Sequence, residues 1–341
     1  MTTNGLFELE ALEQAADVVH AVMPPTPQYA WPLLAHRLGC EVWVKHENYT
    51  PTGAFKVRGG LVYLNELHST GALPSGMITA TRGNHGQSIP YAARRHGVPV
   101  TVVVPEGNSP EKNRAMLAWG AELIVHGADF DESRVEAERL AEEKGLLYAP
   151  SFLPTLVRGV ATYALELFQA VEALDVVYVS IGMGSGICGL ISVRDLLGLQ
   201  TEIVGVVSSE APAFARSLKA GEVVETATAQ TFADGMACRV PNAEAFEIIQ
   251  RGASRIVEVT DHEIAQAMRS LFEDTHNVAE GAGAAGLAAL MQEAGAQRDR
   301  KVAVILTGGN VDTSVFSTVP VSYTHLTLPT NIIRCSGRGA G

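Results

Sequence analysis

Hydrophobic residues recur with a helical period near the start of the chain and then with a strand period. Residues 9–23 place apolar side chains on one side of a predicted amphipathic helix, which the prolines at 24 and 25 end. Residues 40–47, CEVWVKHE, alternate apolar and polar side chains and are expected to form a strand. A second helical pattern covers residues 60–68.

The rest of the chain repeats a rhythm of short apolar segments and helical segments. Predicted strands cover residues 77–81, 98–104, 121–125, 175–181, 202–207 and 302–306. Predicted helices cover residues 86–96, 109–119, 131–144, 159–170, 261–273 and 281–293, and another follows Gly186. Strands that are apolar on both faces and alternate with helices are typical of parallel sheets covered on both sides.

This alternation predicts an α/β fold with two lobes, each an open, mostly parallel, twisted sheet flanked by helices, with a cleft between them. We expect residues 1–75 and 153–320 to form a larger, ligand-binding domain and residues 76–152 a smaller one. No repeat of solenoid length is visible.

The last part of the chain, residues 321–341, differs from the rest because it has no helical period. Within it, VSYTHLTLPT resembles the translation of a sequencing adapter, so we interpret these residues as a non-native tail. The alternative is an ordinary terminal strand followed by a disordered tail. We assign no function to these residues, including Cys335.

Composition narrows the class of function. The 341 residues are 47% hydrophobic and 18% charged, which suits a globular enzyme. A net charge of −12, with no cluster of basic residues, argues against a nucleic-acid partner. The sequence has no membrane-spanning apolar run and no secretory signal. Four scattered cysteines without a CxxC pair favour a reducing cytoplasm over a zinc ribbon or a disulfide framework.

Three glycine-rich turns follow predicted strands: TRGNHGQS at 81–88, GMGSGICG at 182–189 and TGGN at 307–310. In open α/β sheets, ligands bind outside the carboxyl ends of the strands, so all three turns could face one cleft. The stretch PTGAFKVRGG, residues 51–60, adds Lys56 among small residues.

The loop GMGSGICG is suited to bind phosphate through backbone N–H groups and the start of the following helix. It is not a Walker A loop, and it fits the dinucleotide spacing GxGxxG only loosely. A tight turn without a ligand is the alternative. A phosphate loop, a lysine amine and a polar loop with Asn84 together suggest pyridoxal phosphate (PLP), whose aldehyde forms an imine with lysine.

The four motifs resemble those of the fold-type II PLP-dependent enzymes, the group of threonine dehydratase, serine racemase and the tryptophan synthase β subunit. TGAFKVRGG resembles their lysine motif and RGNHGQ their asparagine loop. GMGSG occupies the place of their tetraglycine phosphate loop, and TGGNVD resembles their late Ser/Thr-Gly-Gly-Asn turn. Order and spacing agree over residues 20–318, and the resemblance places the cofactor in the cleft between the lobes.

The resemblance implies a role for each matched residue. Lys56 would bind PLP covalently and take the Cα proton of the substrate, and Phe55 would pack near the ring. Asn84 would hydrogen-bond the ring hydroxyl oxygen, Thr307 would bond the pyridine nitrogen, and Glu280 would lie near the ring. The phosphate would be held by Gly182, Met183, Gly184, Ser185 and Gly186. The substrate carboxylate would be bound by backbone groups of Thr81, Arg82, Gly83, Asn84 and His85.

Three of these residues have alternative interpretations. Glu280 could cap the helix that follows it, and His85 could be a turn residue instead of a proton-transfer group. Arg82 could bind a second substrate carboxylate through a bidentate pair, or make a structural ion pair with an acid of the smaller lobe.

The sequence also departs from the family pattern. Arg82 stands where racemases carry a serine, and arginine is a poor proton shuttle, which favours a lyase. Metal-dependent members carry acids at the places of Val207 and Ala213, so we expect no metal at that site. Ala54 replaces the usual serine before the Phe-Lys pair, with an open effect on substrate choice.

The resulting hypothesis is a PLP-dependent ammonia-lyase that eliminates water from a β-hydroxy-α-amino acid, threonine or serine, and yields a 2-oxo acid and ammonia. The neutral hydroxyl of Thr307 beside the ring nitrogen favours early loss of the β-substituent over transamination. One alternative is a dehydratase of 3-hydroxyaspartate, phenylserine or another β-substituted hydroxy amino acid. The others are a β-replacement enzyme of the cysteine-synthase type and a non-catalytic amino-acid- or PLP-binding protein. The resemblance also implies a homodimer.

Overall fold

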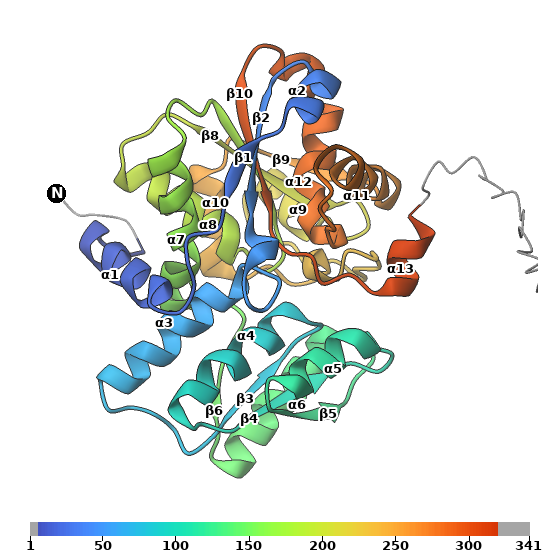
Figure 1. Ribbon diagram of the computed structural model, residues 1–341. Helices are drawn as coiled ribbons and strands as arrows, with labels where there is room; N and C mark the ends of the chain where they lie inside the picture. The colour runs from blue at the N-terminus through green and yellow to red at the C-terminus, as the bar shows by residue number, and fades with distance from the viewer. Residues whose placement is uncertain (1–5, 320–341) are drawn as a thin grey trace, which may run out of the picture.

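The computed structural model describes residues 6–319, which form two lobes lying one above the other in Figure 1. The larger lobe contains a six-stranded sheet of order β1-β2-β10-β7-β8-β9, and the smaller a four-stranded sheet of order β5-β4-β3-β6. β1 pairs with β2 in antiparallel fashion, and the other strand pairs are parallel. The predicted α/β fold is therefore confirmed. The predicted non-native tail, residues 321–341, lies outside the described residues.

The strands of the larger sheet come from the parts of the chain before and after the smaller sheet. They are β1 (Gln28–Ala30), β2 (Glu41–His46), β7 (Val176–Ser180), β8 (Glu202–Ser208), β9 (Arg255–Val259) and β10 (Lys301–Leu306). The strands of the smaller sheet are β3 (Met77–Ala80), β4 (Val100–Val104), β5 (Ala121–Val125) and β6 (Leu147–Tyr148).

Helices cover both sheets. They are α1 (Leu9–His20), α2 (Pro32–Leu38), α3 (Lys56–Ser69), α4 (Asn84–Ala93), α5 (Pro110–Ala118), α6 (Phe130–Lys144), α7 (Pro154–Ala170), α8 (Ser185–Leu196), α9 (Ala213–Ala220), α10 (Ala243–Gly252), α11 (Asp261–Thr275), α12 (Gly281–Gln292) and α13 (Thr313–Thr318). Short 3₁₀ turns lie at η1 (Glu47–Tyr49), η2 (Arg94–His96), η3 (Asp234–Met236) and η4 (Ala294–Gln297). Among residues 6–319, no helix is long and apolar enough to cross a membrane.

The alternating side chains of the central strands explain why these strands are apolar throughout. In β7, Val177 and Val179 belong to a core cluster with α7, α8 and α10. Their neighbours Val176 and Tyr178 belong to a second cluster, on the other face, with α2, α11 and α12. Because successive residues of a strand point to opposite faces, burial of both faces requires a continuous apolar run.

Helix α3 lies between the two lobes in Figure 1 and joins their cores. Its buried residues Val57, Leu61 and Leu64 share a cluster with residues of β4 and α4 in the smaller lobe. It begins at Lys56, four residues earlier than the helical pattern at 60–68 predicts. The lysine is therefore the first helical residue, and its position is tied to the packing of the whole helix.

Candidate active site

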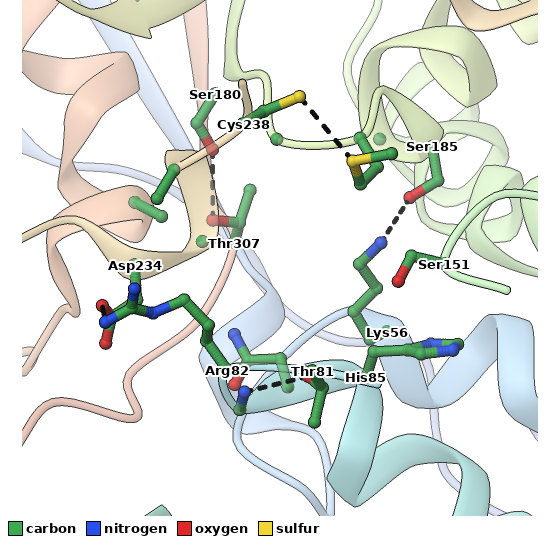
Figure 2. Close-up of a pocket in the computed structure, with 18 of the residues that line it drawn as sticks. Lys56, Thr81, Arg82, His85, Ser151, Ser180, Ser185, Asp234, Cys238 and Thr307 are labelled. Carbon is green, nitrogen blue, oxygen red and sulfur yellow. Dashed lines mark hydrogen bonds and ion pairs between the residues drawn. The ribbon is translucent and has the colours of Figure 1, made fainter. Parts of the chain in front are cut away.

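A cavity lies between the lobes, and the loops that follow β3, β7 and β10 contribute to its wall (Figure 2). It encloses about 870 Å³ of empty space, part of which is open to solvent. The structure brings together every residue that the sequence singled out for the site. These are Phe55, Lys56, Thr81, Arg82, Gly83, Asn84, His85, Gly182, Met183, Gly184, Ser185, Gly186, Glu280 and Thr307.

Lys56 is positioned by main-chain bonds between two distant motifs. The N–H of Phe55 donates a 3.0 Å hydrogen bond to the carbonyl oxygen of Thr307. Ala54 forms an isolated antiparallel bridge with Gly308. The lysine motif and the TGGN turn, from opposite ends of the sequence, are therefore held side by side at one wall of the cavity.

The amine of Lys56 lies in the cavity and donates a 2.9 Å hydrogen bond to the hydroxyl of Ser185 (Figure 2). Burial lowers the pKa of Lys56 to about 8. A neutral amine is a nucleophile and a base, whereas the ammonium form is neither. The site therefore makes the neutral form, which covalent chemistry and proton abstraction require, more abundant than it is in an exposed lysine.

The loop of residues 182–186 has the backbone geometry of a phosphate loop. Gly184 has a φ of +97°, in the left-handed region that favours glycine. A Cβ atom on Gly182 would lie 2.1 Å from the carbonyl oxygen of Gly235. Helix α8 begins at Ser185, and the first N–H groups of a helix have no partner within it. Such groups, with the helix dipole, bind phosphate readily.

Two hydroxyl groups face each other at the ends of β7 and β10. Thr307 is buried, and its hydroxyl lies 3.4 Å from that of Ser180. Ser180 also lines the cavity, but nothing in the sequence distinguished it from the other residues of its strand. Both hydroxyls can donate or accept a hydrogen bond, so they can serve a neutral ring nitrogen.

Glu280 reaches across the cleft instead of capping a helix. It occupies the N-cap position of α12, but its side chain makes no cap hydrogen bond. Its carboxylate instead accepts a 2.7 Å hydrogen bond from the side chain of Asn84. Burial raises the pKa of Glu280, while Lys112 and Asn84 oppose this shift. The capping interpretation is therefore wrong for this side chain.

Arg82 forms an ion pair, but with a partner in the other lobe. Its guanidinium lies 3.1 Å from the carboxylate of Asp234, at the start of η3 (Figure 2). The expected pairing with an acid of the smaller lobe is wrong because this loop faces the cleft. The structure also places Lys112, of α5, 2.9 Å from the same carboxylate.

The imidazole of His85 is buried beside the site. Burial, followed by the charge of Lys56, lowers the pKa of His85 to about 3, so the ring is neutral near pH 7. Its Nε2 lies 3.2 Å from the carbonyl oxygen of Ala149 and donates a hydrogen bond to it in the neutral ring. The hydroxyl of Thr81 accepts a hydrogen bond from the N–H of Gly83 at 2.9 Å. Both side chains stabilise the loop that presents the backbone to the cavity.

Behind the cavity, a buried charge cluster fixes the start of α3. The guanidinium of Arg58 lies 2.7 Å from Glu47 and 2.6 Å from Glu166. Lys45, of β2, lies 2.6 Å from Glu166, of α7. The cluster joins β2, α3 and α7. Because Arg58 lies on α3 two residues after Lys56, these ion pairs help to hold the lysine in place.

Several residues of the cavity wall were missed by sequence reasoning. They are Lys112, Phe130, Ser151, Ser180, Asp234, Gly235, Ala237, Cys238 and Ala282. All of them lie outside the four motifs, and Ser151, Ala237 and Cys238 lie in loops. Cys238, whose thiol pKa burial raises to about 12, lies 3.7 Å from the sulfur of Met183. The only feature of the sequence that could have identified them is their place in the chain, because several lie at or after the ends of predicted strands.

Val207 and Ala213, the two positions that the sequence resemblance associated with a metal site, have buried apolar side chains. Within residues 6–319, no group of three or more His, Cys, Asp or Glu residues could hold a metal ion.

The residues around the cavity fit PLP. The partly buried amine of Lys56, whose pKa is lowered, lies within hydrogen-bond distance of Ser185, at the helix end suited to phosphate. The cavity is concave and lined by a few convergent polar groups, as small-molecule sites are. The amide of Asn84 and the hydroxyl of Thr307 supply polar groups for the ring. The donor set therefore matches the aldehyde, phosphate and ring of this cofactor.

Comparison with known proteins gives the same result. Residues 21–308 match the family described as pyridoxal-phosphate dependent enzyme. The chain is 36% identical to the L-threonine ammonia-lyase of Geobacter sulfurreducens, over 84% of this chain and 71% of that protein. It is 30% identical to the L-threonine ammonia-lyase of Thermotoga maritima, over 92% of this chain and 78% of that one. The processed threonine deaminase isoform 2 of Solanum lycopersicum has a similar structure, with a TM-score of 0.83, 27% identity and coverage of 92% and 93%.

Proposed function

Because the chain belongs to the pyridoxal-phosphate-dependent enzyme family, we propose that it is an ammonia-lyase that eliminates water from threonine or serine and yields a 2-oxo acid and ammonia. The observation that carries this proposal is the partly buried amine of Lys56, which lies in the cavity with the asparagine loop and the phosphate loop at 182–186. The names of the relatives in Geobacter sulfurreducens and Thermotoga maritima support the choice of substrate.

In this proposal, the chain holds the cofactor by residues from both lobes. Lys56 would bind it covalently, and the backbone of 182–186 would bind its phosphate. Phe55 would pack near its ring, Asn84 and Thr307 would provide hydrogen bonds, and Glu280 orients Asn84. When bound, PLP supplies an electron-accepting ring that acidifies the Cα–H bond of an amino acid.

The proton movements fall to the residues around Lys56. Its neutral Nζ accepts the proton from Cα, and Ser185 keeps the amine oriented by their hydrogen bond. The backbone N–H groups of the loop at 81–85 bind the substrate carboxylate, next to the buried, neutral His85. Arg82 is paired with Asp234 and is a poor proton donor, so the proposal does not include racemisation.

The proposal is tested by measuring 2-oxo acid and ammonia release from threonine, serine, 3-hydroxyaspartate and phenylserine. We expect turnover of threonine or serine, and none with Lys56→Ala. Sulfide consumption with an activated serine, without release of a 2-oxo acid, would instead identify a β-replacement enzyme. A holoenzyme that releases ammonia from none of these amino acids would overturn the proposal.

We also propose a cytoplasmic homodimer with a domain division at residues 1–75 and 153–320 against 76–152. The cysteines Cys40, Cys188 and Cys238 are free and buried, which is typical of proteins in a reducing compartment. The four strands of the smaller sheet all lie between residues 77 and 148, which supports the division. Sedimentation equilibrium tests the dimer.

A further inference from the structure

Asp234 bridges the two lobes at the wall of the cavity. One carboxylate oxygen lies 3.1 Å from the guanidinium of Arg82, and the other lies 2.9 Å from the amine of Lys112. Arg82 follows β3 and Lys112 lies in α5, both in the smaller lobe, whereas Asp234 begins η3 in the larger lobe. All three residues line the same cavity as Lys56. Figure 2 shows the side chain of Arg82 extending to Asp234.

The two cations together form an anion-binding site that the protein's own carboxylate occupies. The side chain of Lys112 is only 11% exposed. Burial would lower its pKa, but Glu280 and Asp234 raise it above the ordinary value, so this amine is charged. The Nε atom of Arg82 is buried and has no hydrogen-bond partner within the described residues. The single carboxylate of Asp234 therefore pairs with both cations, and one N–H donor of Arg82 has no acceptor among residues 6–319.

We propose that Asp234 determines substrate specificity by occupying the anion site of Arg82 and Lys112, and so restricts the enzyme to amino acids whose side chain carries no carboxylate. This inference rests on the proposed function and selects among its substrates. A substrate with a second carboxylate would have to displace Asp234 and would be repelled by its charge. The neutral side chains of threonine and serine face no such competition.

The arrangement also changes the expectation for Arg82. The sequence suggested that Arg82 could bind the second carboxylate of a substrate such as 3-hydroxyaspartate. In the structure, the guanidinium of Arg82 is already paired with the carboxylate of Asp234. Removal of the Asp234 charge should therefore create the dicarboxylate site that the wild-type protein lacks. A purely structural ion pair would stabilise the protein but would not change the choice of ligand.

The test measures binding of malonate and propionate to the holoenzyme by calorimetry. The variant Asp234→Asn keeps the side-chain shape and removes the charge. We expect it to bind malonate about tenfold or more tightly than the wild type, because a charge-assisted hydrogen bond contributes this much to affinity. The affinity for propionate should change little. The control Glu143→Gln removes an exposed charge on α6 and should change neither affinity.

A second variant identifies the residue that binds the new carboxylate. Asp234→Asn combined with Arg82→Ala should lose most of the gain in malonate affinity. In the turnover assay, Asp234→Asn should raise kcat/KM for 3-hydroxyaspartate relative to threonine. An equal gain for malonate and propionate, or a gain that persists when Arg82 and Lys112 are both replaced by alanine, would overturn the inference.

The binding and turnover results separate the two proposals. If the wild type converts threonine but malonate binds Asp234→Asn and wild type equally, the specificity inference fails and the function stands. If malonate binds as expected but no hydroxy amino acid is converted, the proposed function fails, and Asp234 still occupies an anion site.

Discussion

Asn310 donates a 2.8 Å hydrogen bond to the side-chain oxygen of Asn84 and thereby fixes the orientation of the Asn84 amide. The amide nitrogen of Asn84 donates in turn to Glu280 at 2.7 Å. An amide nitrogen carries two hydrogens, so a second N–H of Asn84 can serve a ligand in the cavity. The turn after β10 therefore orients a side chain of the other lobe.

Loss of the Glu280 carboxylate should loosen this arrangement. We expect Glu280→Ala to weaken PLP binding about three- to tenfold, because one buried hydrogen bond contributes about 1 kcal/mol. Glu280→Gln keeps an oxygen that can accept from Asn84, so it should have a smaller effect. Titration of the apoenzyme with PLP, followed by fluorescence, measures both. Equal losses in the two variants would show that charge, not orientation of Asn84, matters.

The lowered pKa of Lys56 predicts the pH dependence of cofactor attachment. The neutral amine is the attacking form, so the rate of covalent PLP attachment to the apoenzyme should rise with pH and level off above about pH 8. A lysine with an ordinary pKa of about 10.4 would still gain reactivity at higher pH. Stopped-flow absorbance measures the rate, and Lys56→Ala supplies the baseline. A profile that keeps rising to pH 10 would contradict the effect of burial.

The buried charge cluster predicts a stability effect. Glu166→Gln leaves Arg58 and Lys45 with less negative charge, so the free energy of unfolding should fall by about 3–5 kcal/mol at pH 7. Burial alone would raise the pKa of Glu166, but Arg58 and then Lys45 lower it to about 2. Because the folded pKa lies below the unfolded value of about 4.3, the stabilisation is present above that value and is lost as pH falls toward 2.

Urea denaturation at pH 7 and at acidic pH measures this effect. The difference between wild type and Glu166→Gln should shrink as pH falls through this window. The exposed acid Glu143, which pairs with Arg139, provides the control, since Glu143→Gln should change stability little. A Glu166→Gln variant as stable as the wild type at pH 7 would show that the cluster does not stabilise the fold.

The close contact of α3 with α7 predicts a steric effect. A Cβ atom on Gly159 would lie 2.5 Å from the carbonyl oxygen of Arg58 and 2.8 Å from the Cα of Gly59. Gly159→Ala should therefore lower the free energy of unfolding by about 1–3 kcal/mol, although alanine favours helices. Gly295→Ala, with nothing within 4 Å of the new Cβ, should be tolerated. Thermal or urea denaturation measures the stability of both variants. If Gly159→Ala is as stable as Gly295→Ala, close packing is not the reason for glycine at position 159.

The fold was largely predictable where burial is complete. The apolar runs that form β4 and β7 are buried on both faces. Such strands can be predicted without knowing which elements pack against them. β9 was missed because residues such as Arg255 and Glu258 leave it half-exposed, at the edge of the sheet. The early start of α3 at Lys56 was missed because glycines at 59 and 60 disfavour a helix locally, whereas close packing against neighbouring residues requires them.

The candidate site was predictable only where a motif marks it. Lys56 and Asn84 lie in short patterns whose chemistry can be recognised, and the structure places both at the cavity. Asp234 lies far from Arg82 and Lys112 in the sequence, within a segment that has no periodic pattern. Its position against two cations depends on how the lobes face each other, which local sequence does not encode.

The position of β10 in the larger sheet has a consequence for the growing chain. β10 lies between β2 and β7, so until it is in place the sheet consists of two unconnected parts, β1-β2 and β7-β8-β9. The turn that follows it carries Thr307 and bonds the residue before Lys56. During synthesis, the ribosome must therefore release almost the whole of residues 6–319 before the sheet can close. Until then, the two sheet parts expose unpaired edges that other chains could join.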